Sequence, residues 1–287
     1  MAGNFLVFTS GNSVGTYQID AASGGLTKAG SATISNATAV AADANNVYVA
    51  GDLMPAGSGT GIYGFALAGN GSLTTLAGSP TFFDGSCFFC DTPLVLAVNN
   101  RLLVQGGVGF HGVGDFTVYP RGAGGVLGKA QPLGTDAEER VAIQHPTGNF
   151  AYALDTSDGA LTEFTMDATG KPTPGPAVFT DGQDLTVDAT NKFLLEVDSA
   201  GIVHVFLIDP VTGALSQTGT SEAAGNGAFD ISMDPGGRFV IIGQSTNTGL
   251  PNPANQITVF TFDPVTGAMK KLNSYPQMPG HAVIASL

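Results

Sequence analysis

A stretch that the chain contains twice constrains its fold more than any other feature. Residues 205–215 are Val-Phe-Leu-Ile-Asp-Pro-Val-Thr-Gly-Ala-Leu, and residues 259–269 are Val-Phe-Thr-Phe-Asp-Pro-Val-Thr-Gly-Ala-Met. The alternating β-branched and aromatic residues predict a half-buried strand. Asp-Pro-x-Thr-Gly predicts a tight turn, because Pro fixes φ and Gly accepts a positive φ. Each copy is thus a strand, a turn and a strand, a unit that needs neighbours to bury its apolar face.

Looser copies of this unit extend the repeat along the whole chain. Their apolar anchors follow one another at intervals of 43 to 54 residues: Leu26, Leu73, Leu127, Pro172, Leu215 and Met269. A second pattern lies upstream of each of these units: an apolar strand, a polar turn and another apolar strand. Five copies of this second pattern are internal. The sixth copy is split between the two ends of the chain, with residues 281–287 supplying a strand beside residues 5–8.

Four short strands per repeat of this length are typical of a propeller blade. We therefore predict an all-β chain, a six-bladed β-propeller of four-stranded antiparallel blades. Pairing of the C-terminal strand with the N-terminal strands would close the ring and remove an exposed sheet edge. The alternative is seven blades. Residues 1–287 are expected to form a single domain without a linker.

The composition agrees with many short strands joined by glycine-rich turns. Of 287 residues, 43% are hydrophobic and only 11% charged, and 41 are glycine. The 23 acidic residues exceed the 10 basic ones, for a net charge of −13, which argues against partners such as nucleic acid or an anionic membrane. Few lysines, a Ser/Thr/Asn-rich surface and a close cysteine pair predict a secreted or periplasmic protein whose leader is absent from this chain.

The repeat motifs also resemble a known family. Phe-x-(Ile/Phe)-Asp-Pro-x-Thr-Gly-Ala-Leu, residues 73–80 (Leu-Thr-Thr-Leu-Ala-Gly-Ser-Pro) and residues 233–240 (Met-Asp-Pro-Gly-Gly-Arg-Phe-Val) resemble the lactonase-type propellers. These are the 6-phosphogluconolactonase-like and muconate-cycloisomerase-like proteins, with their secreted YVTN-repeat relatives. The resemblance covers nearly the whole chain, and because it is carried by blade motifs it implies the fold more than the activity.

The chain departs from that family in blade number and in catalytic residues. Family members usually have seven blades, whereas this chain has room for six. Their enzymes carry Pro-Arg-His before an inner strand and a Glu sixteen residues beyond the Arg. Here Arg140 matches the Arg, but Val141 follows it and Thr156 stands at the Glu position. The family's Pro-His-x-His stretch has no counterpart in residues 92–98, and its later Asn-Arg is replaced around Gln244. One of four expected groups is retained, so sugar-lactonase or cycloisomerase chemistry is not carried over.

Candidate site residues come from the positions that open the inner strands, because these face the central channel of a propeller and vary between blades. If the chain is an enzyme, Arg140 would bind or polarise a carbonyl or carboxylate. His281 would be the general base, and Asp184 or Asp230 would orient water or a metal. The remaining ligand-binding candidates are Gln183, Phe229, Glu139 and His111. The alternatives are structural: a solvated ion-pair cluster around Arg140, and a histidine that only bonds backbone.

Several other polar groups suit structural roles. His145 and His204 are expected to be structural. Asp188, Asp209, Asp234 and Asp263 are expected to form turns by accepting bonds from their own backbone.

A metal site and the state of the two cysteines each allow more than one interpretation. Asp184, Asp230 and Glu139 could converge on Ca²⁺, although no EF-hand-like loop is present, and the metal identity is unknown. Cys87 and Cys90 have CxxC spacing in an all-β context, which favours a local disulfide over a redox or zinc site.

Two functions of different class follow from these features. The first is a secreted, lactonase-like propeller, expected to be a monomer, that binds a small polar or anionic molecule in its channel and acts as a hydrolase on a lactone or ester. The second is a non-catalytic surface or scaffold propeller that uses its faces for protein contacts.

Overall fold

The structure is a computed structural model, and it describes thirteen stretches of the chain. These are residues 4–10, 12–42, 45–52, 60–83, 94–97, 101–105, 114–137, 141–155, 159–167, 172–234, 236–244, 256–276 and 282–286. Contacts divide the chain into two compact units. Unit 1 comprises Met1–Ala21, Gly25–Arg140 and Val283–Leu287, and unit 2 comprises Ala22–Gly24 and Val141–Ala282. Within the described stretches, no helix is long and apolar enough to cross a membrane.

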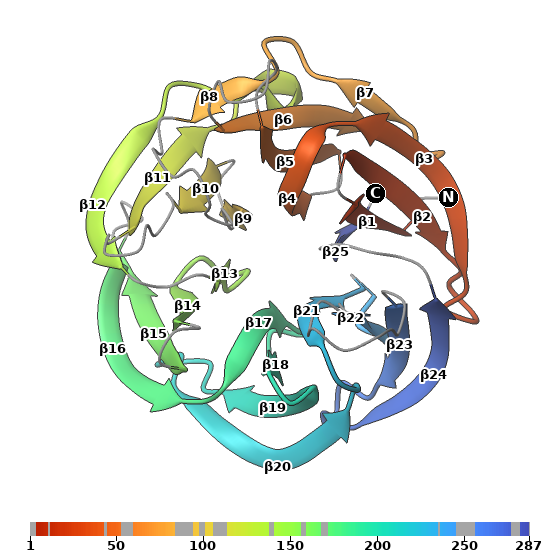
Figure 1. The fold of residues 1–287 in the computed structure, drawn as a ribbon. Helices are drawn as coiled ribbons and strands as arrows, with labels where there is room; N and C mark the ends of the chain where they lie inside the picture. The colour runs from red at the N-terminus through yellow and green to blue at the C-terminus, as the bar shows by residue number, and fades with distance from the viewer. Residues whose placement is uncertain are drawn as a thin grey trace. The chain divides into compact units, whose positions relative to one another are not determined.

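Unit 1 contains three sheets in its described residues (Figure 1). The first has the order β25-β1-β2-β3, from Ala282–Ser286, Asn4–Ser10, Ser13–Ile19 and Leu26–Thr33. The second has the order β4-β5-β6-β7, from Ser35–Ala42, Asn46–Asp52, Thr60–Leu67 and Leu73–Thr75, and β8 (Thr81–Phe83) also pairs with β6. The third has the order β12-β11-β10-β9, from Gln131–Ala137, Gly114–Pro120, Arg101–Gln105 and Leu94–Ala97.

Unit 2 contains three four-stranded antiparallel meanders in its described residues. The first runs β13-β14-β15-β16, from Val141–Gln144, Phe150–Asp155, Ala160–Met166 and Pro172–Phe179. The second runs β17-β18-β19-β20, from Gly182–Val187, Phe193–Asp198, Ile202–Ile208 and Leu215–Ala223. The third runs β21-β22-β23-β24, from Ala228–Met233, Phe239–Gln244, Gln256–Phe262 and Met269–Pro276. Figure 1 shows β17 beside both β13 and β21, so the first strands of the three sheets are neighbours.

These sheets confirm the predicted strand order, with one correction. Across the described residues there are six sheets, and β25 hydrogen-bonds to β1, as predicted for the C-terminal segment. The second sheet was predicted to have four strands but has five. Its outer position is divided, since β7 pairs with Phe65–Leu67 of β6 whereas β8 pairs with Thr60–Ile62. Between them the chain leaves the ladder, and the Ser79 hydroxyl accepts a hydrogen bond from N of Gly64 at 2.8 Å.

The core lies between successive sheets, because alternate residues of each strand face opposite neighbours. On β18, Leu194 joins the cluster that packs sheet β17–β20 against sheet β13–β16, together with Leu154, Leu161 and Phe206. The next residue, Leu195, faces the other way into the cluster shared with sheet β21–β24. Unit 1 has two corresponding clusters between its three sheets. Strands that are apolar on both faces follow from this arrangement.

The repeated turn also links each sheet to its neighbour. Asp209 accepts hydrogen bonds from N of Val211 and Thr212, and Gly213 has a φ of 80°. The Tyr152 hydroxyl of the preceding sheet donates to O of Gly213 at 2.8 Å. The same link to a left-handed glycine recurs in unit 1, from Tyr48 to Gly125 and from Thr16 to Gly71. Each turn thus sets the register of its own hairpin and anchors it to the neighbouring sheet.

The predicted turn-forming aspartates are confirmed. Asp188 is 1% exposed and accepts bonds from N of Thr190, Lys192 and Phe193 and from the Thr190 hydroxyl, at 2.5 to 2.9 Å. Asp234 holds the equivalent turn through N of Gly236, Arg238 and Phe239. Asp263 closes its turn through Val265 and Thr266.

Candidate functional site

Two neighbouring strands of unit 2 open with the same irregularity. The register of β17 on β18 shifts between Gly182 and Asp184, and that of β21 on β22 shifts between Ala228 and Asp230. Gln183 and Phe229 are therefore the extra residues of two equivalent β-bulges, devices that redirect a side chain at a strand end. Both side chains are half-buried. The register places Gln183 and Phe229 at equivalent positions of the two sheets, and likewise Asp184 and Asp230.

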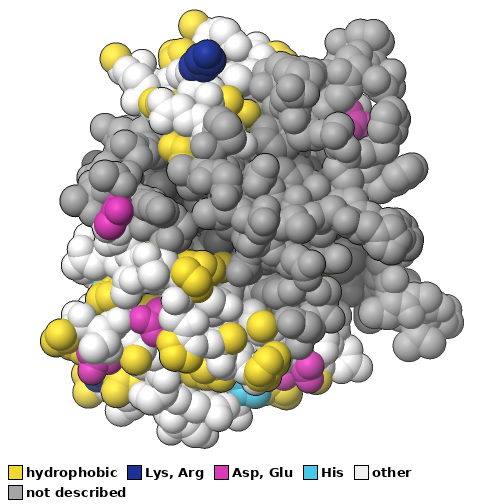
Figure 2. Space-filling view, turned by 90° about the vertical axis from the view of Figure 1, so that its left-hand side faces the viewer, with side chains coloured by type: hydrophobic (Ala, Val, Ile, Leu, Met, Phe, Trp, Pro, Cys, Tyr) yellow, Lys and Arg dark blue, Asp and Glu magenta, His cyan; other side chains and the backbone are white. Residues whose placement is uncertain are grey.

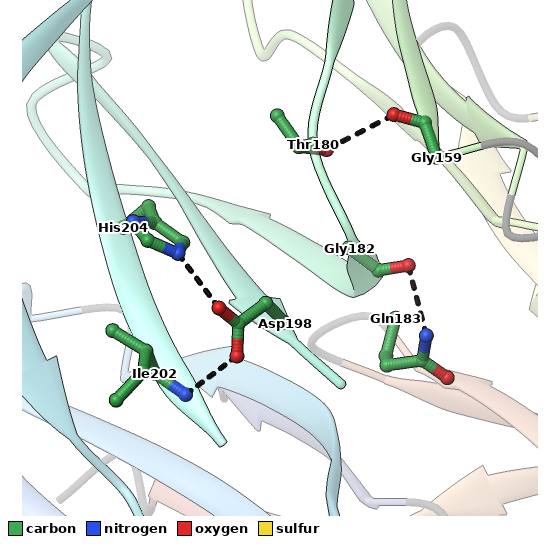
Figure 3. Close-up of polar contacts among 7 residues, drawn as sticks. All are labelled: Gly159, Thr180, Gly182, Gln183, Asp198, Ile202 and His204. Atoms are coloured by element: carbon green, nitrogen blue, oxygen red, sulfur yellow. Dashed lines mark hydrogen bonds and ion pairs between the residues drawn. The ribbon is translucent and has the colours of Figure 1, made fainter. Parts of the chain in front are cut away.

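The carboxylates that follow the bulges differ in their surroundings. The Oδ2 atom of Asp184 accepts a hydrogen bond of 2.8 Å from N of Ile231, so this side chain ties β17 to β21. Asp230 is 6% exposed. The amide of Gln183 donates to O of Gly182 at 3.1 Å, as Figure 3 shows, which holds the side chain beside its own backbone. The sequence did not predict that Asp184 has a structural bond; its predicted role in orienting water or a metal stays a prediction.

Most of the other predicted site residues fall outside the described stretches. They are Arg140, Glu139, His111 and His281, together with Cys87 and Cys90 of the predicted disulfide. Among the residues that the structure does describe, no group of three or more His, Cys, Asp or Glu side chains could hold a metal ion. The described residues of the Ca²⁺ hypothesis, Asp184 and Asp230, do not form such a group by themselves.

A polar group that the sequence analysis missed lies at the same end of sheet β17–β20. Asp198 ends β18, and its Oδ2 atom lies 2.9 Å from Nε2 of His204 on β19. Its Oδ1 atom accepts from N of Ile202 at 2.7 Å, so the carboxylate is held on both oxygens (Figure 3). The side chain of His204 is 26% exposed. The imidazole is thus held in place by a carboxylate and is partly exposed, which agrees with the structural role expected of His204.

Glu196 stands directly opposite His204 across the β18 and β19 ladder. It is 0% exposed, and neither carboxylate oxygen has a hydrogen-bond partner in the described part of the chain. Burial raises the pKa of Glu196 to about 7, against smaller lowering effects from the Thr180 hydroxyl and from His204. That hydroxyl donates instead to O of Gly159, at 3.4 Å, as drawn in Figure 3. A carboxyl with this pKa changes charge near neutral pH.

One signal in the sequence would have identified Glu196. Aligning the strands by register places Val49, Ala153 and Ile242 at the same position in three other sheets, and all three are buried and apolar. A glutamate in an otherwise apolar column is conspicuous once the repeats are superposed, although the sequence alone does not show that it lacks a partner.

Sheet β21–β24 has a different polar group at its corresponding end. Gln244 is 7% exposed, and its Oε1 atom accepts from Nε2 of Gln256 and from the Thr258 hydroxyl at 2.6 and 2.8 Å. Its own amide donates to O of Ala224 at 3.1 Å. The network is neutral and well bonded, which is typical of a structural role.

His145 occupies the opposite end of the strands and confirms its structural assignment. Its Nδ1 lies 2.8 Å from the Thr147 hydroxyl, and its Nε2 lies 3.2 Å from O of Asn191 in the next sheet. The side chain is buried and stacks edge-on against Phe150. It links two turns of unit 2 and is far from the strand openings in register.

Few charged side chains lie among the described residues of the face that Figure 2 draws. On the face drawn in Figure 2, the described side chains are mostly uncharged, with scattered apolar and acidic residues among them. Several apolar side chains lie in or near turns and strand ends, including Val211 at 82% and Phe179 at 76% exposure. Apart from the neighbours Val178 and Phe179, the exposed large apolar residues are separated along the sequence, as is common on protein surfaces.

Comparison with known proteins supports the fold. No protein-family model matches the sequence, and no curated protein does. Among solved structures, a provisionally assigned 6-phosphogluconolactonase from Bacteroides fragilis matches with a TM-score of 0.72 at 17% identity, over 100% of this chain and 98% of that one. The periplasmic gluconolactonase of Pseudomonas aeruginosa matches with a TM-score of 0.70 at 17% identity, over 99% of both chains.

A third match comes from outside the lactonases. A chain of a nidogen/laminin complex matches with a TM-score of 0.63 at 14% identity, over 98% of both chains. At these identities the likeness concerns the fold and leaves function to be argued from residues. The chain is an all-β propeller that matches the 6-phosphogluconolactonase and gluconolactonase propellers along its full length.

Proposed function

We propose that the chain is a lactonase-like propeller that binds a small polar or anionic molecule where its inner strands begin and hydrolyses a lactone or ester. The proposal includes six blades closed into one ring by β25 and a single domain. It also includes a secreted or periplasmic location, which the periplasmic gluconolactonase among the structural matches supports.

The observation that carries the proposal is the pair of bulges at Gln183 and Phe229. Bulges commonly redirect side chains next to binding sites, and these two lie at the openings of neighbouring inner strands. The two bulged residues differ in chemistry, one an amide and one an aromatic ring. A small asymmetric ligand fits such a mixed set, since the ring offers apolar contact and the amide offers directional hydrogen bonds.

Each candidate residue has one role in the proposed reaction. Arg140 would bind the carbonyl or carboxylate of the substrate with its guanidinium group, which suits planar oxygen pairs. His281 would take a proton from water as that water attacks the carbonyl carbon. The alkoxide that leaves when the ester bond breaks would receive this proton from His281. Asp230 would orient the water, and Asp184 would keep β17 and β21 in register through its bond to Ile231.

Turnover of a panel of lactones and esters by the purified chain tests the proposal. Arg140→Ala should lower kcat/KM at least 100-fold, because a substrate anchor is lost. Arg238→Ala is the matched control: Arg238 pairs with Asp234 in the turn at the other end of β21, and its loss should leave kcat/KM within about twofold. Equal effects of the two substitutions, or no turnover of any substrate by the wild type, would contradict the hydrolase.

The second candidate is a non-catalytic propeller that contacts other proteins. It is favoured by the match to a chain of the nidogen/laminin complex and by the structural bond of Asp184. Gln183→Ala and Phe229→Ala distinguish the candidates, because a small-molecule site predicts weaker ligand binding in calorimetry for both variants. A scaffold predicts no small-molecule binding by either the wild type or the variants.

A further inference from the structure

Glu196 is a buried acid for which the proposed hydrolysis has no use. Its carboxyl lies between sheets β13–β16 and β17–β20, on the side of β18 that also carries Leu194 into their shared core. Both oxygens are enclosed and lack hydrogen-bond partners in the described part of the chain. Transfer of an ionised carboxylate into such surroundings without a partner is strongly unfavourable, so the neutral form is the one that fits.

The repeats provide an internal control for this position. Three other sheets place Val49, Ala153 or Ile242 there, each at most 2% exposed. The fold therefore packs well with an apolar residue at this point, and hydrophobic replacements of buried polar groups are often neutral or stabilising. The carboxyl is not required by the scaffold.

The side chain of Glu196 fills the space beside the opening of β17. A Cβ atom at Gly182 would lie 2.6 Å from Oε1 of Glu196 and 2.7 Å from Cδ2 of Leu154, so only glycine fits at the start of β17. The charged groups that act on Glu196 are His204 on β19, Asp198 on β18 and Asp181 before β17. From the facing sheet, Leu154 lies beside Gly182. Among the described residues, none of the charged groups that shift the pKa of Glu196 comes from that sheet, although Glu163 lies there on β15.

We infer that Glu196 is a proton-binding site that makes the packing of sheet β17–β20 on sheet β13–β16 depend on pH. With its proton, the carboxyl stays in the apolar interface. Without it, the carboxylate must draw in water or move outward, and the groups nearest to it are Gly182 and Thr180 at the opening of β17. The raised pKa of Glu196 places this change near neutral pH. The inference does not depend on the proposed hydrolase.

The experiment compares unfolding by urea at pH 5 and pH 8 for the wild type, Glu196→Gln and Glu163→Gln. Glutamine has the shape of glutamate but no titratable proton. Relative to Glu196→Gln, the unfolding equilibrium constant of the wild type should rise on the order of 100-fold between pH 5 and pH 8, because the folded state binds the proton more tightly than the unfolded state. Parallel pH profiles for the two proteins would overturn the inference.

Glu163 on β15 is the matched control, since it lies in the facing sheet and is less buried. Burial and Asp209 raise its pKa in the same direction but to a smaller extent, so Glu163→Gln should follow the wild-type profile closely. A Glu163→Gln profile that is as flat as that of Glu196→Gln would also contradict the assignment, because the pH dependence would not be specific to Glu196.

A second measurement does not depend on any variant folding. In wild-type protein labelled with ¹³C at glutamate carboxyls, one resonance should titrate near pH 7, well above the ordinary range of glutamate. Amide exchange of β18 should increase over the same pH range as the interface loosens. If every glutamate carboxyl titrates below about pH 5.5, the proton site does not exist.

Discussion

Sheets β17–β20 and β21–β24 share the same strand order and register but differ in a pair of facing residues on their second and third strands. Both begin with a bulge, at Gln183 and Phe229, and both use an aspartate to hold the next turn. Where the second sheet has Ile242 opposite Thr258, the first has Glu196 opposite His204. In the second sheet the corner formed by this pair holds an apolar side chain and a hydrogen-bonded hydroxyl. In the first it holds a carboxyl without a hydrogen-bond partner among the described residues, opposite a histidine that is bonded to Asp198. The two sheets therefore keep the same backbone pairing at these positions while the side chains differ between apolar and ionisable.

The largest expected effect comes from making the second sheet resemble the first. Ile242→Glu places a carboxyl in a cluster of Val240, Phe260 and other apolar side chains. Loss of apolar burial and desolvation of the charge should lower the free energy of unfolding by about 5 kcal/mol at pH 8 and by less at pH 5. Thermal or urea unfolding measures this. Ile242→Leu should cost less than about 1.5 kcal/mol, and an equally large loss there would indicate a shape effect.

A feature that the two sheets share should be the next most sensitive. Asp188→Ala removes an acceptor of four hydrogen bonds in a buried turn, which should cost about 4 kcal/mol. Asp209→Ala, in an exposed turn of the same sheet, should cost much less because water replaces the carboxylate. Urea unfolding of both variants tests the contrast, and equal losses would show that burial does not decide the strength of these turns.

Making the first sheet resemble the second should have a stabilising effect. The free energy of unfolding of the wild type should fall between pH 4.5 and pH 7, because the unfolded state releases the Glu196 proton over this range and the folded state retains it. Glu196→Leu removes that loss and should be more stable than the wild type by about 3 kcal/mol at pH 8, with little gain at pH 4.5. If Glu196→Leu gains the same stability at both pH values, the gain comes from packing and not from removal of an ionisable group.

The smallest expected effect concerns the bonded corner of the second sheet. Thr258→Val removes the hydroxyl that donates to Gln244 at 2.8 Å and should lower stability by about 1 kcal/mol at every pH. Thr261→Val on the same strand is the control, because the Thr261 hydroxyl is exposed and its bond to Lys270 is 3.3 Å long. A pH-dependent loss in Thr258→Val would show that this corner also contains a titrating group.

The sequence predicted those parts of the molecule that depend on neighbouring residues. Asp-Pro-x-Thr-Gly identifies a turn, and Gly213 and Gly267 have the positive φ expected of them. The pairing of β25 with β1 followed from counting repeats, because a truncated first copy requires a strand from the other end of the chain. The divided outer strand of the second sheet was not predicted, since residues 76–80 leave the ladder through contacts with Gly64.

The candidate site was predicted only in outline. The prediction that Gln183 and Phe229 lie where inner strands open was correct, because period and register survive in a repeat. The bond from Ile231 to Asp184, in contrast, joins residues 47 positions apart. The pair of Asp198 and His204 and the unpaired carboxyl of Glu196 were missed for the same reason. Sequence determines strands, turns and their order, because these depend on local propensity and periodicity. Only the packed sheets decide whether a buried polar group has a partner, since that depends on which side chains of other strands come within 3 Å.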